Sequence, residues 1–221
     1  MRRRVQLPRM RLSGGERAGQ TLAAPKGKKT RPTSAKVREA LFGVLGKRIS
    51  DARVLDLFAG SGALGFEAMS RGARSVVFVD SDAAAVMAIR RNAVRLLGNI
   101  DCWRILPMSA LRALRTLRGT FDIVLVDPPY QRGAAEELTM LMQRGLLSEG
   151  AVVVLEHPTV AQATLPASMR LLKRTKYGDT ALTFAVLRSS DQTQPEESAQ
   201  EAERPRRGSA RNGARRRPAR K

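Results

Sequence analysis

The chain has 221 residues, of which 43% are hydrophobic, and its formal net charge is +20. This length suffices for one domain with a sizeable core plus appendages. No apolar stretch approaches the roughly 20 residues that a membrane-spanning helix needs. The single cysteine, Cys102, excludes an internal disulfide and a multi-cysteine metal site. We therefore expect a soluble, cytoplasmic protein that holds no metal and works as a monomer.

The positive charge is concentrated at the ends of the chain. Residues 1–38 hold 12 basic residues and one acidic residue, whereas residues 39–188 hold 19 and 14. Such an excess is typical of proteins that bind a polyanion, above all a nucleic acid. Residues 189–221 contain no Val, Ile, Leu, Met or aromatic residue, so they cannot bury enough apolar surface to fold. We expect a basic nucleic-acid-binding segment (1–38), a folded domain (39–188) and a disordered basic tail (189–221).

The middle of the chain alternates between two hydrophobic patterns. Ser34 can cap a first helix that ends before Gly46. Short apolar runs then predict buried strands at residues 53–58, 75–80, 102–106, 121–127 and 150–156, and helical periodicity predicts helices at 82–97, 109–118 and 136–146. This alternation indicates an α/β domain with a parallel sheet and right-handed crossovers. Residues 169–188 predict a hairpin appended to that sheet.

A glycine-rich loop follows the first of these strands. The sequence DLFAGSGALGFE places Gly60, Gly62 and Gly65 in a G-x-G-x-x-G pattern, and Asp80 ends the next strand 20 residues after Gly60. This spacing is typical of a dinucleotide site, although a tight turn without a ligand is an alternative. Asp56, just before the loop, would repel a diphosphate but attract the ammonium and sulfonium of S-adenosylmethionine. Asp80 would then accept hydrogen bonds from the ribose, and the glycines would let the backbone approach the amino-acid end.

The sequence DPPY, residues 127–130, closes the fourth strand. In a doubly wound sheet this strand lies next to the first, at the edge where ligands bind. Pro128 and Pro129 hold the turn extended and stiff. Asp127 and the Pro128 carbonyl could accept the two hydrogens of an exocyclic amine while its lone pair faces a methyl donor. Tyr130 offers a ring on which an extruded base could stack, so the tetrapeptide predicts base methylation.

Four motifs in this order resemble one family closely. TRPTSAKVREALFGVLG, LDLFAGSGALGFEAMSRGA, DPPY and YGDTALTF resemble the bacterial 16S rRNA (guanine-N2)-methyltransferases of the RsmD type, over roughly residues 11–188. The resemblance implies a Rossmann-like, class I S-adenosylmethionine-dependent methyltransferase fold with a seven-stranded, mostly parallel sheet. It also implies a guanine of 16S rRNA as substrate, within a partly assembled small ribosomal subunit. By motif position, Asp56, Gly60, Gly62 and Asp80 would hold the cofactor, and residues 127–130 the guanine.

Further site residues are expected around these motifs. An acid or amide is expected after the third strand to hold the adenine ring, but this chain has Met108-Ser109, so backbone groups or the Ser109 hydroxyl would substitute. Arg31, Thr33 and Arg38 are expected near the mouth of the active site. There they would hold RNA phosphates or order the N-terminal segment over the pocket. Arg132 is a second candidate for contact with a phosphate.

Two other functions remain open at this stage. Adenine-N6 or cytosine-N4 methylation of DNA uses the same tetrapeptide chemistry, because that chemistry serves any exocyclic amine. The segment TRPTSAKVREALF and the lack of room for a target-recognition domain favour RNA. A noncatalytic RNA-binding or ribosome-assembly factor on a degenerate fold is the other alternative, against which the intact DPPY argues.

Overall fold

The computed structural model describes residues 10–25, 34–98, 101–129, 133–161 and 163–188. The chain divides into two units, Met1–Ser189 and Ser190–Lys221. The tail that the sequence predicts to be disordered lies outside the described residues. Within the described part, no helix has the length and apolar character needed to cross a membrane.

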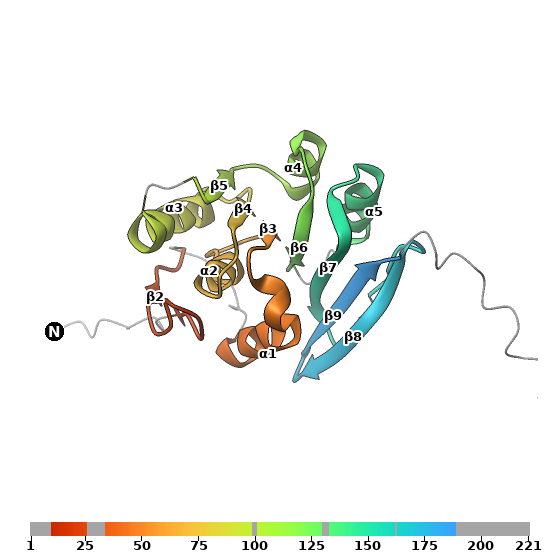
Figure 1. The fold of residues 1–221 in the computed structure, drawn as a ribbon, viewed down its shortest axis with the longest axis horizontal. Coiled ribbons are helices and arrows are strands. Elements are labelled where there is room, and N and C mark those ends of the chain that lie inside the picture. The colour runs from red at the N-terminus through yellow and green to blue at the C-terminus, as the bar shows by residue number, and fades with distance from the viewer. Residues whose placement is uncertain (1–9, 26–33, 99–100, 130–132, 162, 189–221) are drawn as a thin grey trace, which may run out of the picture. The chain divides into compact units, whose positions relative to one another are not determined.

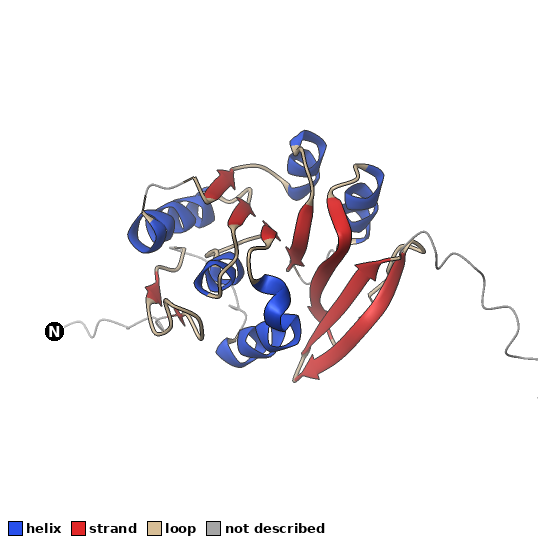
Figure 2. Cartoon of the chain, in the orientation of Figure 1, coloured by secondary structure: helices blue, strands red, loops and turns tan. Residues whose placement is uncertain are grey.

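A seven-stranded sheet forms the centre of the domain (Figures 1 and 2). Its strands are β3 (Arg53–Leu57), β4 (Ser75–Val79), β5 (Trp103–Leu106), β6 (Phe121–Val126), β7 (Leu147–Pro158), β8 (Met169–Tyr177) and β9 (Thr180–Leu187). Their order is β5-β4-β3-β6-β7-β9-β8. The strands from β3 to β7 pair in parallel, whereas β9 runs antiparallel to β7 and β8. The predicted α/β class, mostly parallel sheet and C-terminal hairpin are therefore confirmed.

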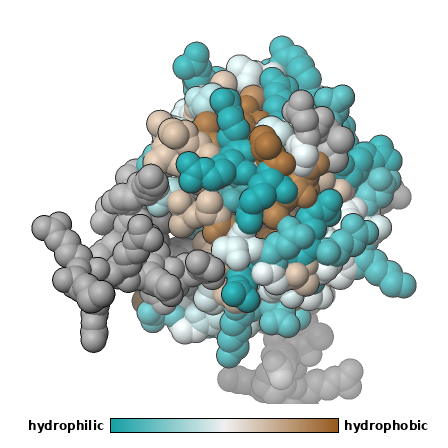
Figure 3. Space-filling view, turned by 90° about the vertical axis from the view of Figure 1, so that its left-hand side faces the viewer, coloured by the Kyte–Doolittle hydropathy of each residue, from teal (hydrophilic) through white to brown (hydrophobic). Residues whose placement is uncertain are grey.

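Helices cover both faces of this sheet (Figure 1). They are α1 (Ala35–Leu45), α2 (Ala63–Ser70), α3 (Ala83–Leu97), α4 (Ala110–Thr116) and α5 (Ala135–Gln143). Buried side chains of α1, α2 and α3 share one hydrophobic cluster, and those of α4 and α5 share another. Strand residues alternate between the two, with Val54 in the first and Leu55 in the second. The face shown in Figure 3 is mixed, with hydrophilic side chains around hydrophobic patches.

The structure refines the predicted boundaries in two places. The third crossover helix ends at Gln143 instead of continuing to Leu146, because Gly145 adopts a positive φ of 59° and turns the chain. Strand β7 then begins at Leu147, with a register shift between Phe121 and Ile123 of its neighbour β6. Before the shift, β7 pairs with β6 only at Leu147, which lies opposite Phe121; after it, pairing resumes at Val152 and Ile123.

The N-terminal segment contributes elements that the sequence did not predict. Strands β1 (Met10–Arg11) and β2 (Thr21–Leu22) form an antiparallel pair, and Leu12 and Leu22 lie in the same hydrophobic cluster as α1, α2 and α3. After α1, the 3₁₀ helix η1 (Gly46–Ile49) leads to β3. At the start of α1, the Ser34 Oγ accepts the Val37 N–H at 3.2 Å, which confirms the predicted cap.

Gly65 allows α2 to pack directly on β4. A Cβ at Gly65 would lie 2.2 Å from Phe78 Cε1 and 2.9 Å from Val76 Cγ1. We expect Gly65→Ala to lower the free energy of unfolding by about 1–3 kcal/mol, because the buried ring has no space to move into. Gly43→Ala is the control, since nothing lies within 4 Å of its Cβ. It should leave the stability unchanged or raise it by up to about 1 kcal/mol. Equal stabilities of the two variants in urea denaturation would contradict this packing.

Candidate cofactor and active site

Three acidic residues meet at the carboxyl edge of the sheet. Asp56 lies in β3, Asp80 follows β4 and Asp127 follows β6, and β3 pairs in parallel with both β4 and β6. The Asp127 N–H donates to the Leu57 carbonyl at 3.5 Å, which continues the ladder beyond β6. Parallel pairing therefore brings together three carboxyl groups that are far apart in the sequence.

Asp56 is buried beneath the glycine loop. Its side chain is 1% exposed, and its Oδ2 accepts the Gly65 N–H at 2.9 Å. Burial raises the pKa of Asp56 to about 8; the Gly65 hydrogen bond opposes this shift, while the charges of Asp127 and Asp80 add to it. The direct cofactor contact predicted for Asp56 does not fit this placement. Asp56 instead fixes the first turn of α2.

The glycine loop between β3 and α2 has an unusual backbone. Phe58, Gly60 and Gly62 have φ values of 61°, 57° and 78°, a region that side chains with a Cβ rarely adopt. A Cβ at Gly62 would lie 2.6 Å from a Phe66 ring carbon, so packing requires this glycine. A Cβ at Gly60 would meet only the Phe58 carbonyl, at 4.0 Å. The open space beside Gly60 is where a ligand can approach the backbone.

Asp80 holds this loop and keeps capacity for a ligand. Its Oδ2 accepts the Gly60 N–H at 2.7 Å and its Oδ1 accepts the Asp82 N–H at 2.8 Å. An ionised carboxylate offers about four lone-pair sites, and Asp80 is partly exposed. Ser109 is exposed at the N-cap of α4, and its hydroxyl makes no capping hydrogen bond. Both side chains are therefore available to hydroxyl or amine groups of a ligand.

These residues fit S-adenosylmethionine better than a dinucleotide. The open space at Gly60 and the remaining capacity of Asp80 suit an adenosine and an amino-acid group. A diphosphate would face the carboxyl groups of Asp80 and Asp127, whereas an ammonium and a sulfonium would be attracted by them; Asp56, buried and with its pKa raised to about 8, adds little charge at neutral pH. Gly60, Asp80 and Ser109 are the described residues that would hold the cofactor.

Two surface hollows are lined by residues other than Asp56, Asp80 and Asp127. One, of about 360 Å³, lies between α4 and α5 and is lined by Leu111 and Met140 among others. The other, of about 530 Å³, includes Arg53, Asp122 and Val152, at the opposite end of the parallel strands. Because neither hollow includes Gly60, Asp80 or Ser109, neither is assigned to the cofactor.

The tetrapeptide at the end of β6 is described only in part. Asp127 is partly exposed, Pro128 is buried and Pro129 is exposed. Tyr130 lies outside the described residues, so its stacking on a base stays a prediction. Arg31, Thr33 and Arg132 also lie outside the described residues, and their contacts with RNA phosphates stay predictions as well.

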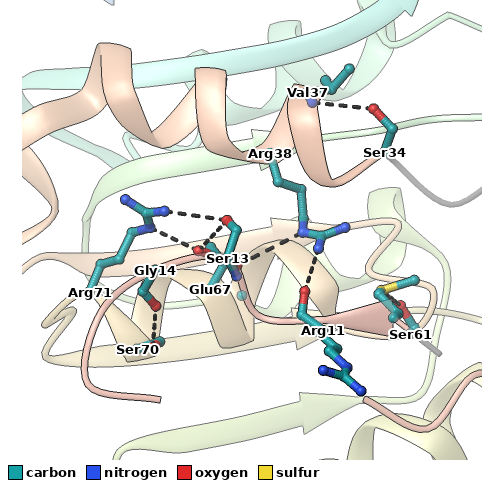
Figure 4. Close-up of polar contacts among 12 residues, drawn as sticks. Arg11, Ser13, Gly14, Ser34, Val37, Arg38, Ser61, Glu67, Ser70 and Arg71 are labelled. Carbon is teal, nitrogen blue, oxygen red and sulfur yellow. Dashed lines mark hydrogen bonds and ion pairs between the residues drawn. The ribbon is translucent and has the colours of Figure 1, made fainter. Parts of the chain in front are cut away.

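Arg38 lies in the interior and not at the mouth of the site. Its side chain is 2% exposed, its Nη2 donates to the Arg11 carbonyl at 2.6 Å, and its Nε is 3.9 Å from Glu67 Oε2 (Figure 4). Burial lowers the pKa of Arg38, and the charge of Glu67 opposes that shift. An RNA phosphate cannot reach this guanidinium, so the predicted phosphate contact is wrong. The alternative prediction, that Arg38 orders the N-terminal segment, agrees with these contacts.

Glu67 is the centre of a network that sequence reasoning missed (Figure 4). It is fully buried in α2. Its Oε2 accepts the Ser13 N–H at 2.8 Å, and its Oε1 accepts the Ser13 hydroxyl at 2.8 Å and the Arg71 Nε–H at 2.9 Å. A buried carboxylate needs such partners to offset its desolvation. The signal in the sequence is the single charge in the otherwise uncharged helix ALGFEAMS.

Asn92 joins the N-terminal segment to the glycine loop. It is fully buried in α3. Its Oδ1 accepts the Ala23 N–H at 2.8 Å, and its Nδ2 donates to the carbonyls of Ala23 at 3.0 Å and Ser61 at 3.3 Å. The Ser61 hydroxyl also lies 3.5 Å from Met10 Sδ. One end of the β1–β2 hairpin therefore contacts Ser61 of the glycine loop directly, through Met10, and the other end is joined to Ser61 through Asn92.

The fold, the glycine loop and the acidic carboxyl edge together define a class I S-adenosylmethionine-dependent methyltransferase. Residues 10–186 match the family model described as Conserved hypothetical protein 95, and the chain belongs to this family, which is of the RsmD type.

Similar proteins agree with this class. Ribosomal RNA small subunit methyltransferase D of Escherichia coli K12 is 36% identical over 78% of this chain and 87% of its own length. The protein of the same name from Haemophilus influenzae is 31% identical, over 76% and 89%. The solved structure of "Putative methyltransferase yhhF" from Escherichia coli has a TM-score of 0.72 and 33% identity, covering 81% of this chain and 98% of that one. The chain is an enzyme whose cofactor is S-adenosylmethionine.

Asn92→Asp tests the link between the hairpin and the loop. The new carboxylate cannot donate to the carbonyls of Ala23 and Ser61, so the loop loses a constraint beside Gly60. We expect the Kd and KM for S-adenosylmethionine to rise about tenfold, since the variant lacks one or two buried hydrogen bonds, with kcat at saturating cofactor largely retained. Calorimetric titration and steady-state kinetics measure this. The exposed neighbour Arg91→Gln is the control; a lower melting temperature with unchanged cofactor affinity would reduce Asn92 to a purely structural role.

Asp56→Asn tests the raised pKa. An unfolded Asp titrates near 3.9, and Asp56 in the folded protein near 8. Between these values the folded state binds a proton that the unfolded state does not, so this group lowers stability as pH rises from 4 to 8. The variant keeps an acceptor for Gly65 but does not titrate. Its stability relative to the natural protein should therefore rise by up to about 1.4 kcal/mol per pH unit in this window and level off above it. Urea denaturation at pH 6, 7, 8 and 9 measures this; a pH-independent difference would contradict it.

Proposed function

We propose that this enzyme transfers the methyl group of S-adenosylmethionine to N2 of a guanine in the 16S rRNA of the small ribosomal subunit. The observation that carries the proposal is the position of Asp127-Pro128 at the end of β6, directly beside the glycine loop that follows β3. A base held by the first would lie next to a cofactor held by the second. The names of the relatives support ribosomal RNA as the substrate class.

Methylation of this amine depends on the orientation of the amine more than on a strong base. The lone pair of the guanine N2 is delocalised into the ring, and it must be turned toward the donor. Asp127 and the Pro128 carbonyl accept the two N2 hydrogens and hold the amine in that orientation. Bound S-adenosylmethionine supplies the electrophilic methyl group. As the N–C bond forms and the S–C bond breaks, the amine loses one proton, which passes to Asp127 or to water.

The charge of the chain supports a large anionic substrate. The excess of basic residues in 1–38 and 189–221 favours association with RNA. We infer that these segments bind RNA around the folded domain, that the substrate is a partly assembled particle, and that the enzyme works as a monomer in the cytoplasm. Arg31, Thr33 and Arg132 are the proposed phosphate contacts, and Tyr130 the proposed stacking platform.

Asp127→Ala tests the proposed catalytic role. Removal of the acceptor leaves the amine misoriented, so kcat should fall by about 100-fold or more, while the Kd for S-adenosylmethionine changes less than about threefold. Asp101→Ala, an exposed acid elsewhere in the domain, is the control and should retain both values. Retained turnover in the Asp127 variant would overturn the assignment of Asp127.

The substrate class is tested by supplying labelled S-adenosylmethionine with small-subunit particles, protein-free 16S RNA, or DNA. Label that becomes soluble on ribonuclease treatment supports the proposal, and the better of the two RNA substrates identifies the assembly stage. Label in DNA would overturn the substrate while leaving the methyltransferase class intact.

A further inference from the structure

The edge strand β8 carries a high density of positive charge on both of its faces. Arg170, Lys173, Arg174 and Lys176 make up four of its nine residues, all four are exposed, and β8 contains no acidic residue. Arg170 and Lys173 pair with Val186 and Phe184 of the first hydrophobic cluster, whereas Arg174 and Lys176 lie on the other face. We call these four residues the β8 basic stripe. Within the described part of the chain, none of them forms an ion pair, and Arg174 Nη2 donates to the Ala161 carbonyl at 3.0 Å. Their charges are therefore available to a partner.

The register of the sheet places this stripe level with a stretch from the middle of β6 to its end. Arg174 pairs with Thr183 of β9. Thr183 pairs with Leu155 of β7, and Leu155 pairs with Val126, the residue before Asp127. Arg174 is thus level with the residue before the proposed catalytic aspartate, whereas Arg170, which pairs with Val186 and through it with Val152, is level with Ile123 in the middle of β6.

The distance from Arg174 to the end of β6 suits a nucleic-acid strand. Strand β8 is three positions from β6 in the sheet, which corresponds to about 14 Å at roughly 4.8 Å per strand. A stacked nucleic-acid strand rises about 3.4 Å per nucleotide, so this gap spans about four nucleotides. Lys176 lies nearest the hairpin turn, since it pairs with Ala181, opposite His157 of β7.

The active edge cannot attract RNA by itself. Asp80 and Asp127 would repel phosphates that approach the target base, so an anionic substrate needs positive charge close by but outside the cofactor site. Contacts with phosphates position a nucleic acid without reading its sequence, and an exposed basic strand suits that role. Lysines on an edge strand also discourage pairing with another sheet. If that were their only role, removing them would not change the affinity for RNA.

We propose that the β8 basic stripe binds the phosphate backbone of the substrate RNA within a few nucleotides of the target guanine. This inference rests on the proposed function, since it takes RNA as the substrate. The stripe holds the strand by charge, and Asp127-Pro128 selects the base.

The double variant Lys173→Gln with Lys176→Gln removes two charges and retains the Arg174 bond to Ala161. We expect the KM for small-subunit RNA to rise about tenfold at physiological salt, with kcat and the Kd for S-adenosylmethionine unchanged. The slope of log KM against log salt should fall by about 0.7 for each phosphate that the variant no longer neutralises. Lys173→Arg with Lys176→Arg keeps the charge and should restore both KM and slope.

The matched control is Arg90→Gln with Arg91→Gln. Both arginines are exposed on α3, which lies at the other end of the sheet from β8 (Figure 1). This variant removes the same number of charges, and we expect it to leave the KM for RNA and its salt slope unchanged. If the natural protein methylates RNA and the β8 pair behaves like the α3 pair, the inference is wrong and the proposed function stands. A raised KM with an unchanged salt slope would also contradict phosphate binding. If the natural protein transfers no methyl group to RNA, the proposed function fails and the inference falls with it.

Discussion

Parallel pairing of β3 with both β4 and β6 is the constraint on which the site depends. It aligns the ends of three strands and so brings Asp56, Asp80 and Asp127 to one edge. The three acids divide the work. Asp56 is buried and fixes the start of α2, Asp80 holds the glycine loop with capacity left for a ligand, and Asp127 is partly exposed where the substrate base is proposed to bind. The acidity that attracts a cationic cofactor also repels RNA, which therefore needs positive charge elsewhere on the domain.

The described part of the N-terminal segment, residues 10–25, is hydrogen-bonded to the elements around the candidate cofactor site. Glu67 fastens Ser13 to α2, and Asn92 fastens Ala23 to the carbonyl of Ser61. Helix α2 begins where the glycine loop ends, and Asn92 of α3 donates to Ser61 of that loop, so hydrogen bonds of buried side chains connect the β1–β2 hairpin to the glycine loop and to the helix that follows it. A buried polar group that loses its hydrogen-bond partner costs much more free energy than an exposed one. Displacing the hairpin would deprive Glu67 and Asn92 of their partners Ser13 and Ala23, which ties the position of the hairpin to that of the glycine loop.

Much of the fold could be predicted from the sequence because its signals are local. Apolar runs, the Ser34 cap and the glycines that end helices identified nearly every element, and the ends of β3, β4 and β6 identified the edge with the site. The hydrogen bonds of Asn92 could not be predicted, since they join residues 69 and 31 positions apart. Arg38 was misplaced for a related reason. A basic residue in the first turn of an amphipathic helix predicts a solvated side chain, and only the tertiary structure shows that Glu67 and the Arg11 carbonyl lie against Arg38.

The measurement that tests this account most directly is nucleoside analysis of small-subunit RNA after transfer from labelled S-adenosylmethionine. The RNA is taken from cells that lack the enzyme, so that the target position is unmodified. The arrangement of Asp127 and Pro128 beside the glycine loop predicts methylation of an exocyclic amine, and the proposed function predicts N2-methylguanosine at a single position. Label in a methylated ribose, in the C5 position of a pyrimidine, or in no nucleoside at all would contradict it.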